Sequence, residues 1–160
     1  MKYVPLAIVA STVDDSHTWN LIGVELRLRE RGFKVINLGC CTPPELLAKT
    51  VRQHRPDLTV ISSVNGHGSM NGLTLAKLLS QYQAFNASLI VIGGKLTIDN
   101  VLPTQVVLSL KRAGYNAVLS GPNAWRNLDR LLERADFVLM RKEMCRTSAN
   151  VAISGEVAVG

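Results

Sequence analysis

An aspartate and a histidine two residues apart, Asp15 and His17, are the residues of this sequence best placed for chemistry. They follow the apolar run 5–10, where a first strand is expected to pass into a helix. A carboxylate at this spacing can accept the N–H of one ring nitrogen, which fixes the tautomer and makes the other nitrogen a better metal ligand. The pair therefore favours a metal-ligating imidazole, although an exposed loop histidine near a helix start satisfies the same pattern.

Further polar and small residues occur where other strands are expected to end. Residues 62–68 follow the third apolar run and combine hydroxyls and an amide with glycines on both sides of His67. Gly93 and Gly94 follow the fourth run, and Gly121 follows the fifth. A glycine lets backbone approach a ligand closely, although each glycine taken alone also fits an ordinary turn. Because open α/β sheets bind ligands at the carboxyl ends of their strands, these residues together predict one site at that edge.

Apolar, β-branched runs alternate with segments of helical length along most of the chain. The predicted strands are residues 4–10, 33–38, 57–63, 88–92 and 116–119. The predicted helices are residues 18–31, 43–54, 69–84, 103–113 and 123–134. This alternation with short connections predicts an α/β protein with a flavodoxin-like (Rossmann-like), doubly wound, five-stranded parallel sheet in the order 2-1-3-4-5.

Turn and capping residues mark several of the predicted helix ends. Pro43 and Pro44 open the second helix, where a proline in the first turn is favourable. Gly32 follows the first helix and Gly114 the fourth, as expected for residues that take up the left-handed conformation just past a helix. The sequence thus predicts both the identity and the approximate limits of these helices.

The length of 160 residues, with 47% hydrophobic and 19% charged residues, fits one globular domain. We expect the binding domain to cover residues 1–136, followed by a C-terminal extension or tail at 137–160 that lacks clear periodicity. No segment reaches the roughly 18 apolar residues of a membrane span, and the N-terminus passes directly into a strand. The expected location is therefore the cytoplasm, without a membrane partner.

The net charge of +6 is spread over the chain rather than gathered into a basic stripe, so no nucleic-acid partner is expected. An acidic partner protein or an anionic cofactor accounts for the charge equally well. The three cysteines, two of them adjacent at Cys40 and Cys41, suit neither a disulfide framework nor a zinc site. The sequence also shows no carboxylate pair for acid–base work, no nucleophile beside a base and no phosphate loop. Binding of a cofactor is therefore favoured over transformation of a substrate by this chain.

Three short motifs, at residues 15–20, 62–64 and 93–94, occur in the order and at about the spacing of a known family pattern. The pattern is Asp-x-His-x-x-Gly, then Ser-x-Leu, then Gly-Gly. It belongs to the cobalamin-binding domain of the adenosylcobalamin-dependent mutases, which this chain resembles over most of its length. The resemblance is closest to the small subunits of the glutamate (methylaspartate) mutases. Asn20 stands where the pattern has glycine, and Val64 stands where it has leucine.

The resemblance implies that the cofactor is adenosylcobalamin, bound with its own dimethylbenzimidazole detached from cobalt. His17 is then the lower cobalt ligand, Asp15 accepts the second ring N–H, and Ser62 contacts the detached tail. The residues expected to bind the cofactor are Asp15, Ser16, His17, Thr18, Ser62, Val64, Asn65, Gly66, Gly93, Gly94 and Gly121.

The resemblance further implies one component of an isomerase that is inactive alone and contributes no catalytic residue. A separate large subunit would hold the substrate, with conversion of glutamate to 3-methylaspartate as the expected reaction and a homodimer within a heterotetramer as the assembly. A corrinoid carrier for methyl transfer is an alternative, but such carriers usually have a preceding helical cap domain, and only three residues precede the first predicted strand here. A degenerate module, in which Asn20 abolishes cobalamin binding, is the other alternative.

Overall fold

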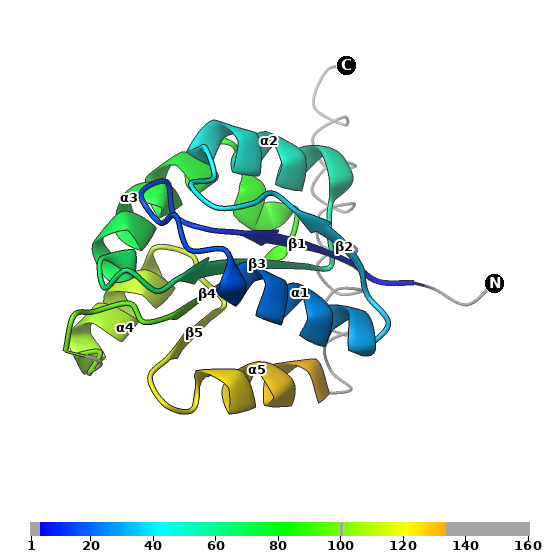
Figure 1. The fold of residues 1–160 in the computed structure, drawn as a ribbon. Helices are drawn as coiled ribbons and strands as arrows, with labels where there is room; N and C mark the ends of the chain where they lie inside the picture. Colours follow the sequence, from blue (N-terminus) through cyan, green and yellow to red (C-terminus); the bar gives the residue numbers. More distant parts are fainter. Residues whose placement is uncertain (1–3, 100, 134–160) are drawn as a thin grey trace, which may run out of the picture.

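A five-stranded parallel sheet lies between two layers of helices in the computed structural model, which describes residues 4–99 and 101–133 (Figure 1). The strands are β1 (Leu6–Ala10), β2 (Lys34–Asn37), β3 (Leu58–Ser63), β4 (Leu89–Gly94) and β5 (Ala117–Ser120). Their order is β2-β1-β3-β4-β5, and every neighbouring pair is parallel. The predicted flavodoxin-like sheet is therefore confirmed.

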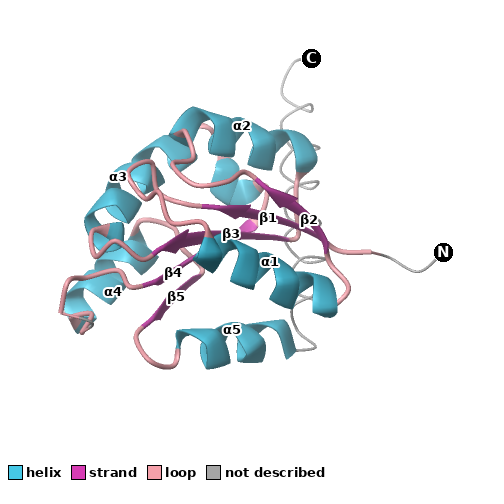
Figure 2. Ribbon diagram, viewed as in Figure 1, coloured by secondary structure: helices cyan, strands magenta, loops and turns pink. Residues whose placement is uncertain are grey.

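The helices between the strands also follow the predicted pattern, with one difference (Figure 2). They are α1 (Trp19–Glu30), α2 (Pro44–His54), α3 (Gly68–Gln81), α4 (Thr104–Arg112) and α5 (Ala124–Glu133), with a short 3-10 helix η1 (Ala84–Asn86). The prediction that the third helix runs to residue 84 is wrong, because Gln83 has a left-handed φ of 55° and separates α3 from η1. A non-glycine residue in this conformation is uncommon, so the sequence gives little warning of the break.

The capping residues act as predicted. Pro44 is the first residue of α2, where its missing N–H removes a donor that would have no partner inside the helix. Gly32 after α1 and Gly114 after α4 have φ values of 84° and 123°. Both therefore use the left-handed conformation that favours glycine just past a helix.

The alternation of side chains along each strand divides the core into two parts, one on each face of the sheet. Ile8 and Ala10 belong to the core under α2, α3 and α4, which we call the α2–α4 face. Ala7 and Val9 belong to the core under α1 and α5, which we call the α1/α5 face. Figure 1 shows α1 and α5 together on one side of the sheet. The α1/α5 core is the smaller one and takes a single buried residue, Leu128, from α5.

The order of the strands opens a crevice at one edge of the sheet. The chain leaves β1 through α1 toward β2 on one side, whereas β3 pairs with β1 on the other side. The helices that follow β1 and β3 therefore cover opposite faces of the sheet, and the carboxyl ends of strands at such a point are the usual place for a ligand. The predicted extension at 137–160, and the domain boundary at 136, lie outside the described residues.

Candidate cofactor-binding site

Asp15, on the loop after β1, is fully buried and connects the loops after β1 and β3. Its Oδ1 accepts hydrogen bonds from the His17 backbone N–H at 3.0 Å and from His17 Nδ1 at 2.7 Å. Its Oδ2 accepts hydrogen bonds from the Ser63 hydroxyl at 3.0 Å and the Val64 backbone N–H at 2.6 Å. Both oxygens are thus fully used, so the carboxylate holds the two loops in one arrangement.

The hydrogen bonds also decide the charge of Asp15. Burial by itself raises the pKa of this carboxyl, but the hydrogen bonds from His17, Val64 and Ser63 stabilise the ionised form and lower the pKa below its ordinary value. The carboxylate is therefore ionised at neutral pH and can only accept hydrogen bonds. His17 Nδ1 must then carry the proton, so Nε2 is the ring nitrogen that can offer a lone pair to a ligand.

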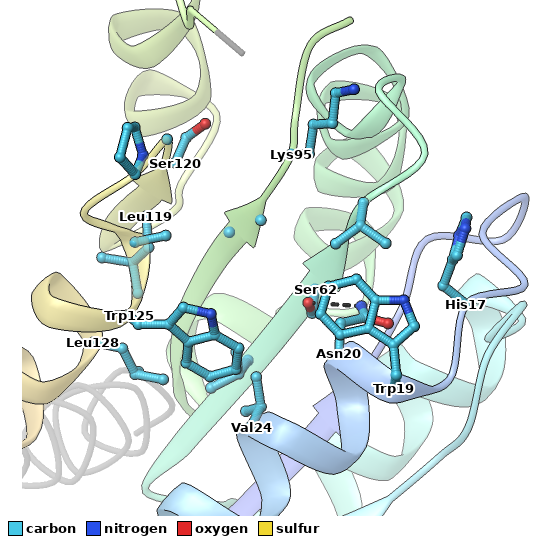
Figure 3. Close-up of a pocket in the computed structure, with 17 residues that line it drawn as sticks. His17, Trp19, Asn20, Val24, Ser62, Lys95, Leu119, Ser120, Trp125 and Leu128 are labelled. Atoms are coloured by element: carbon cyan, nitrogen blue, oxygen red, sulfur yellow. Dashed lines mark hydrogen bonds between the residues drawn. The ribbon is translucent and has the colours of Figure 1, made fainter.

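His17 stands at the mouth of a cavity of about 510 Å³ at the carboxyl edge of the sheet, between α1 and α5 (Figure 3). Its side chain is 47% exposed, so the ring is anchored through Asp15 and still open to a ligand. The cavity is lined by His17, Trp19, Asn20, Val24, Val60, Ser62, Val64, Gly93, Gly94, Lys95, Leu119, Ser120, Gly121, Pro122, Ala124, Trp125 and Leu128. Most of these side chains are apolar or small, which suits a flat organic group with few polar atoms.

The two glycines at the end of β4 have a structural reason to be glycine. A Cβ on Gly93 would lie 2.6 Å from the Leu119 carbonyl oxygen of the neighbouring strand. Gly94 has a φ of 111°, and a Cβ there would lie 2.2 Å from the Ser63 carbonyl oxygen. Close strand packing therefore requires both glycines, and the same lack of side chains leaves the cavity wall open beside them.

Several predicted site residues lie beside the cavity rather than in it. Ser16 and Thr18 are exposed on the His17 loop. Asn65 is half-buried, and its backbone N–H donates to Asp15 Oδ2 at 3.3 Å, so it belongs to the Asp15 network. Gly66 is buried at a turn with a φ of 86°. These four residues are close to the site in the chain but do not line the cavity.

Other residues of the site were not predicted. Ser63, the second serine of its motif, bonds to Asp15, whereas Ser62 lines the cavity. The alternation of side chains along β3 could have separated the two roles. Trp19 and Trp125, which are 61% and 38% exposed, also line the cavity. Lys95, an exposed residue of the lining, had no signal beyond its place after Gly94.

Asn20, at the motif position of glycine, is a buried part of the cavity wall. It is 2% exposed, and its Nδ2 donates to the Ser62 hydroxyl oxygen at 2.9 Å, the dashed line in Figure 3. Its Oδ1 is buried without a hydrogen-bond partner among the described residues. The substitution thus leaves the cavity in place and adds a polar group to its wall.

Comparison with known proteins places this site in a family. A family model described as B12 binding domain matches residues 5–105. The chain belongs to the B12-binding domain family. The match includes the Asp15–His17 loop, the serines at the end of β3 and the glycines at the end of β4. The matched part of the chain is therefore a cobalamin-binding domain.

Individual relatives are more distant. The glutamate mutase sigma subunit of Halobacterium salinarum is 27% identical to this B12-binding domain over 117 residues, covering 72% of this chain and 76% of that protein. The monomethylamine corrinoid protein of Methanosarcina barkeri has a TM-score of 0.65 at 19% identity, covering 82% of this chain. A cobalamin-binding protein from Desulfitobacterium hafniense has a TM-score of 0.61 at 16% identity, covering 80% of this chain. The chain spans 58% of the length of each of these two structures, which share its fold.

Two features are absent from the described residues. No group of three or more His, Cys, Asp or Glu side chains comes together there in the manner of a site for a bare metal ion. Within the same residues, none of the helices has the length and apolar character needed to cross a membrane.

Proposed function

We propose that this chain is the cobalamin-binding small subunit of an adenosylcobalamin-dependent carbon-skeleton mutase, with His17 as the lower cobalt ligand. The observation that carries the proposal is the 2.7 Å contact between Asp15 Oδ1 and His17 Nδ1 at the mouth of the cavity. It leaves Nε2 of a partly exposed imidazole free to bind a metal, as a ligand requires.

The donor set fits a corrinoid. Imidazole suits a borderline metal such as cobalt, and a hydrogen-bonded carboxylate behind the ring makes it a stronger donor. Among the described residues, His17 has no cluster of further metal ligands beside it. A single histidine is sufficient for a metal that its own macrocycle already holds. The cavity of about 510 Å³ beside His17 has a wall suited to a flat, detached base. The chemistry of the site thus agrees with the family match.

The proposed roles of the cavity residues follow from where they lie. Ser62 contacts the detached nucleotide tail, and Val64 supplies an apolar wall in place of the motif leucine. Gly93 and Gly94 line the slot on the β4 side, and Gly121 lines it on the β5 side.

We keep four more residues in the proposed site because they lie on the two loops that Asp15 connects. Ser16 and Thr18 flank His17, while Asn65 and Gly66 follow Val64 on the loop after β3.

Bound adenosylcobalamin supplies radical chemistry through homolysis of its cobalt–carbon bond. The work of this chain is to bind the cofactor, fix the direction of the imidazole through Asp15, and enclose the tail. The substrate would be held by a separate catalytic large subunit, with glutamate to 3-methylaspartate as the proposed reaction. The named activity of the Halobacterium salinarum relative supports this reaction at 27% identity. The chain is then the cofactor-binding component of an isomerase and inactive alone.

A corrinoid carrier for methyl transfer is the second candidate, because the Methanosarcina barkeri corrinoid protein shares the fold. The sequence relatives favour the mutase instead, since three of them are glutamate mutase sigma subunits at 22–27% identity. Two incubations distinguish the candidates: one with a glutamate mutase large subunit, adenosylcobalamin and glutamate, and one with methylcobalamin and a thiol as the methyl acceptor. Formation of 3-methylaspartate supports the mutase, whereas methyl transfer from methylcobalamin without this product supports the carrier.

Titration of adenosylcobalamin with the protein tests the proposed site through the visible spectrum. We expect saturable conversion to the base-off, histidine-bound form in the wild type. The matched control is His67→Ala, which removes another exposed histidine and should leave this spectrum unchanged. His17→Ala should abolish it. A wild type that produces no spectral change, or a His17→Ala variant that produces the same one, contradicts the proposal.

A further inference from the structure

The wall of the cavity contains a polar group whose hydrogen bonding is incomplete. Asn20 is 2% exposed and uses Nδ2 to donate to Ser62, but its Oδ1 is buried and has no partner among the described residues. A buried carbonyl oxygen without a hydrogen bond is unfavourable, and buried side-chain oxygens usually have a partner. Asn20 therefore adds an acceptor for which the described residues provide no donor.

The position of Asn20 shows which kind of molecule can supply that donor. Asn20 and Ser62 both line the cavity, and Figure 3 shows them side by side in its wall. Val24, Val60 and Leu128 also line the cavity and offer no polar side-chain atom. For Oδ1 to meet a ligand in the cavity, the buried amide has to turn toward it. The missing donor therefore belongs on the group that fills the cavity, which is the detached tail in the function proposed above.

Ser62 adds the complementary half of the recognition surface. Its Oγ accepts the hydrogen bond from Asn20, so its own hydroxyl proton is available to donate. Asn20 Oδ1 and the Ser62 hydroxyl together offer one acceptor and one donor close to each other. An aminopurine matches this pair, because adenine carries an amino donor beside a ring-nitrogen acceptor. Detached dimethylbenzimidazole has a ring-nitrogen acceptor for Ser62 but no N–H for Asn20.

We infer that Asn20 makes this cavity select a cobamide whose detached lower base carries an N–H donor, of the adenine type, over one with dimethylbenzimidazole. The inference rests on the proposed function, because it assumes that the tail occupies the cavity. It assigns to Asn20 a specificity role beyond the binding of cobalamin as such.

The experiment compares two cofactors and four proteins. Adenosylcobalamin and its analogue with adenine as the lower base are each titrated into the wild type, Asn20→Ala, Asn20→Gly and Ile22→Ala, and the dissociation constants are taken from the visible spectrum. The two free cofactors differ in how tightly the base holds cobalt in solution. Because this difference is the same for every protein, it cancels when the ratio of the two constants is compared between variants.

We expect the preference for the adenine analogue to fall about tenfold in Asn20→Ala, the effect of one buried hydrogen bond. Asn20→Gly, which restores the family motif, should show the same loss. Ile22→Ala is the matched control, because it shortens an exposed residue of the same helix α1 that does not line the cavity. Its ratio should equal that of the wild type. Thermal unfolding of each variant establishes that it is folded before titration.

Failure of the inference is distinguishable from failure of the proposed function. An unchanged ratio in Asn20→Ala overturns the inference, while a base-off, histidine-bound spectrum of the wild type preserves the function. A preference for the adenine analogue that increases in Asn20→Ala also overturns the inference. That result would mean that the Asn20 amide has the opposite orientation and that its Nδ2 donates to dimethylbenzimidazole. Absence of binding of either cofactor to the wild type overturns both.

Discussion

The two faces of the sheet are packed in different ways. On the α2–α4 face, α3 lies so close to β4 that a Cβ on Gly72 would be 2.5 Å from Ile92 Cδ1. The buried Tyr115 hydroxyl donates to the Gly72 carbonyl at 2.7 Å, and Phe85 packs edge-on against the Tyr115 ring. The α1/α5 face instead contains the cavity of about 510 Å³. The α2–α4 face is thus closely packed, whereas the α1/α5 face leaves space for a ligand.

Helix α5 stays on the α1/α5 face although it contributes a single buried side chain, Leu128. Arg27 of α1 forms a 2.6 Å ion pair with Asp129 of α5 and lies 4.8 Å from the centre of the Trp125 ring. Arg31 adds a second contact to Asp129 at 3.2 Å. Partly exposed polar contacts thus hold α5 against α1, in contrast to the apolar packing of the α2–α4 face.

Shortening one leucine on each face gives the largest expected effect. Leu79→Ala, in the α2–α4 core, should lower the free energy of unfolding by about 3 to 4 kcal/mol. Leu128→Ala should lower it by about 2 kcal/mol, because Leu128 already borders the cavity and has fewer contacts to lose. Urea unfolding measures both values. Equal losses would break the comparison between the faces.

Removal of the buried carboxylate tests the binding side. Asp15→Ala should weaken cobalamin binding about 10- to 100-fold, because the ring of His17 loses its acceptor and its fixed direction. Asp14→Ala removes the same charge from an exposed neighbour on the loop, and it should change the affinity less than about threefold. Spectroscopic titration measures both. An affinity that is unchanged in Asp15→Ala would refute the role of the carboxylate.

The smallest expected effect concerns the contacts between α1 and α5. Asp129→Asn should lower the free energy of unfolding by about 0.5 to 1 kcal/mol, since its ion pairs are partly exposed. The loss should shrink at about 1 M salt, where exposed charges are screened. Glu25→Gln serves as the control, because its partners, Arg29 in α1 and Asn37 in β2, do not belong to α5. A salt-independent loss in Asp129→Asn would mean that packing, rather than charge, holds α5.

The fold was predictable because its signals are local. The alternating apolar runs, Pro44 and the glycines after α1 and α4 together predicted the elements and the sheet order. The break after α3 was not predictable, because it depends on a left-handed Gln83 rather than on a glycine or proline. Local patterns describe helices and strands well, but they do not report individual backbone conformations that tertiary packing imposes.

The site was predictable in its parts but not in its connections. The spacing of Asp15 and His17 indicated their hydrogen bond, which the structure shows at 2.7 Å. The bonds from Asp15 to residues 63–65 join segments about 50 positions apart, and no sequence period reports such a contact. Likewise, the contact of Asn20 with Ser62 and the lack of a partner for Asn20 Oδ1 follow from the tertiary structure, and no local pattern reports them.

The two oxygens of Asp15 hold different parts of the site, and this has a mechanical consequence. One oxygen holds the imidazole of His17, and the other holds the first residues beyond β3. The Asp15 carboxylate therefore couples the position of the His17 ring directly to the end of β3, in the middle of the sheet. If His17 coordinates the cofactor as proposed, a displacement of that group would reach β3, the strand that pairs with both β1 and β4.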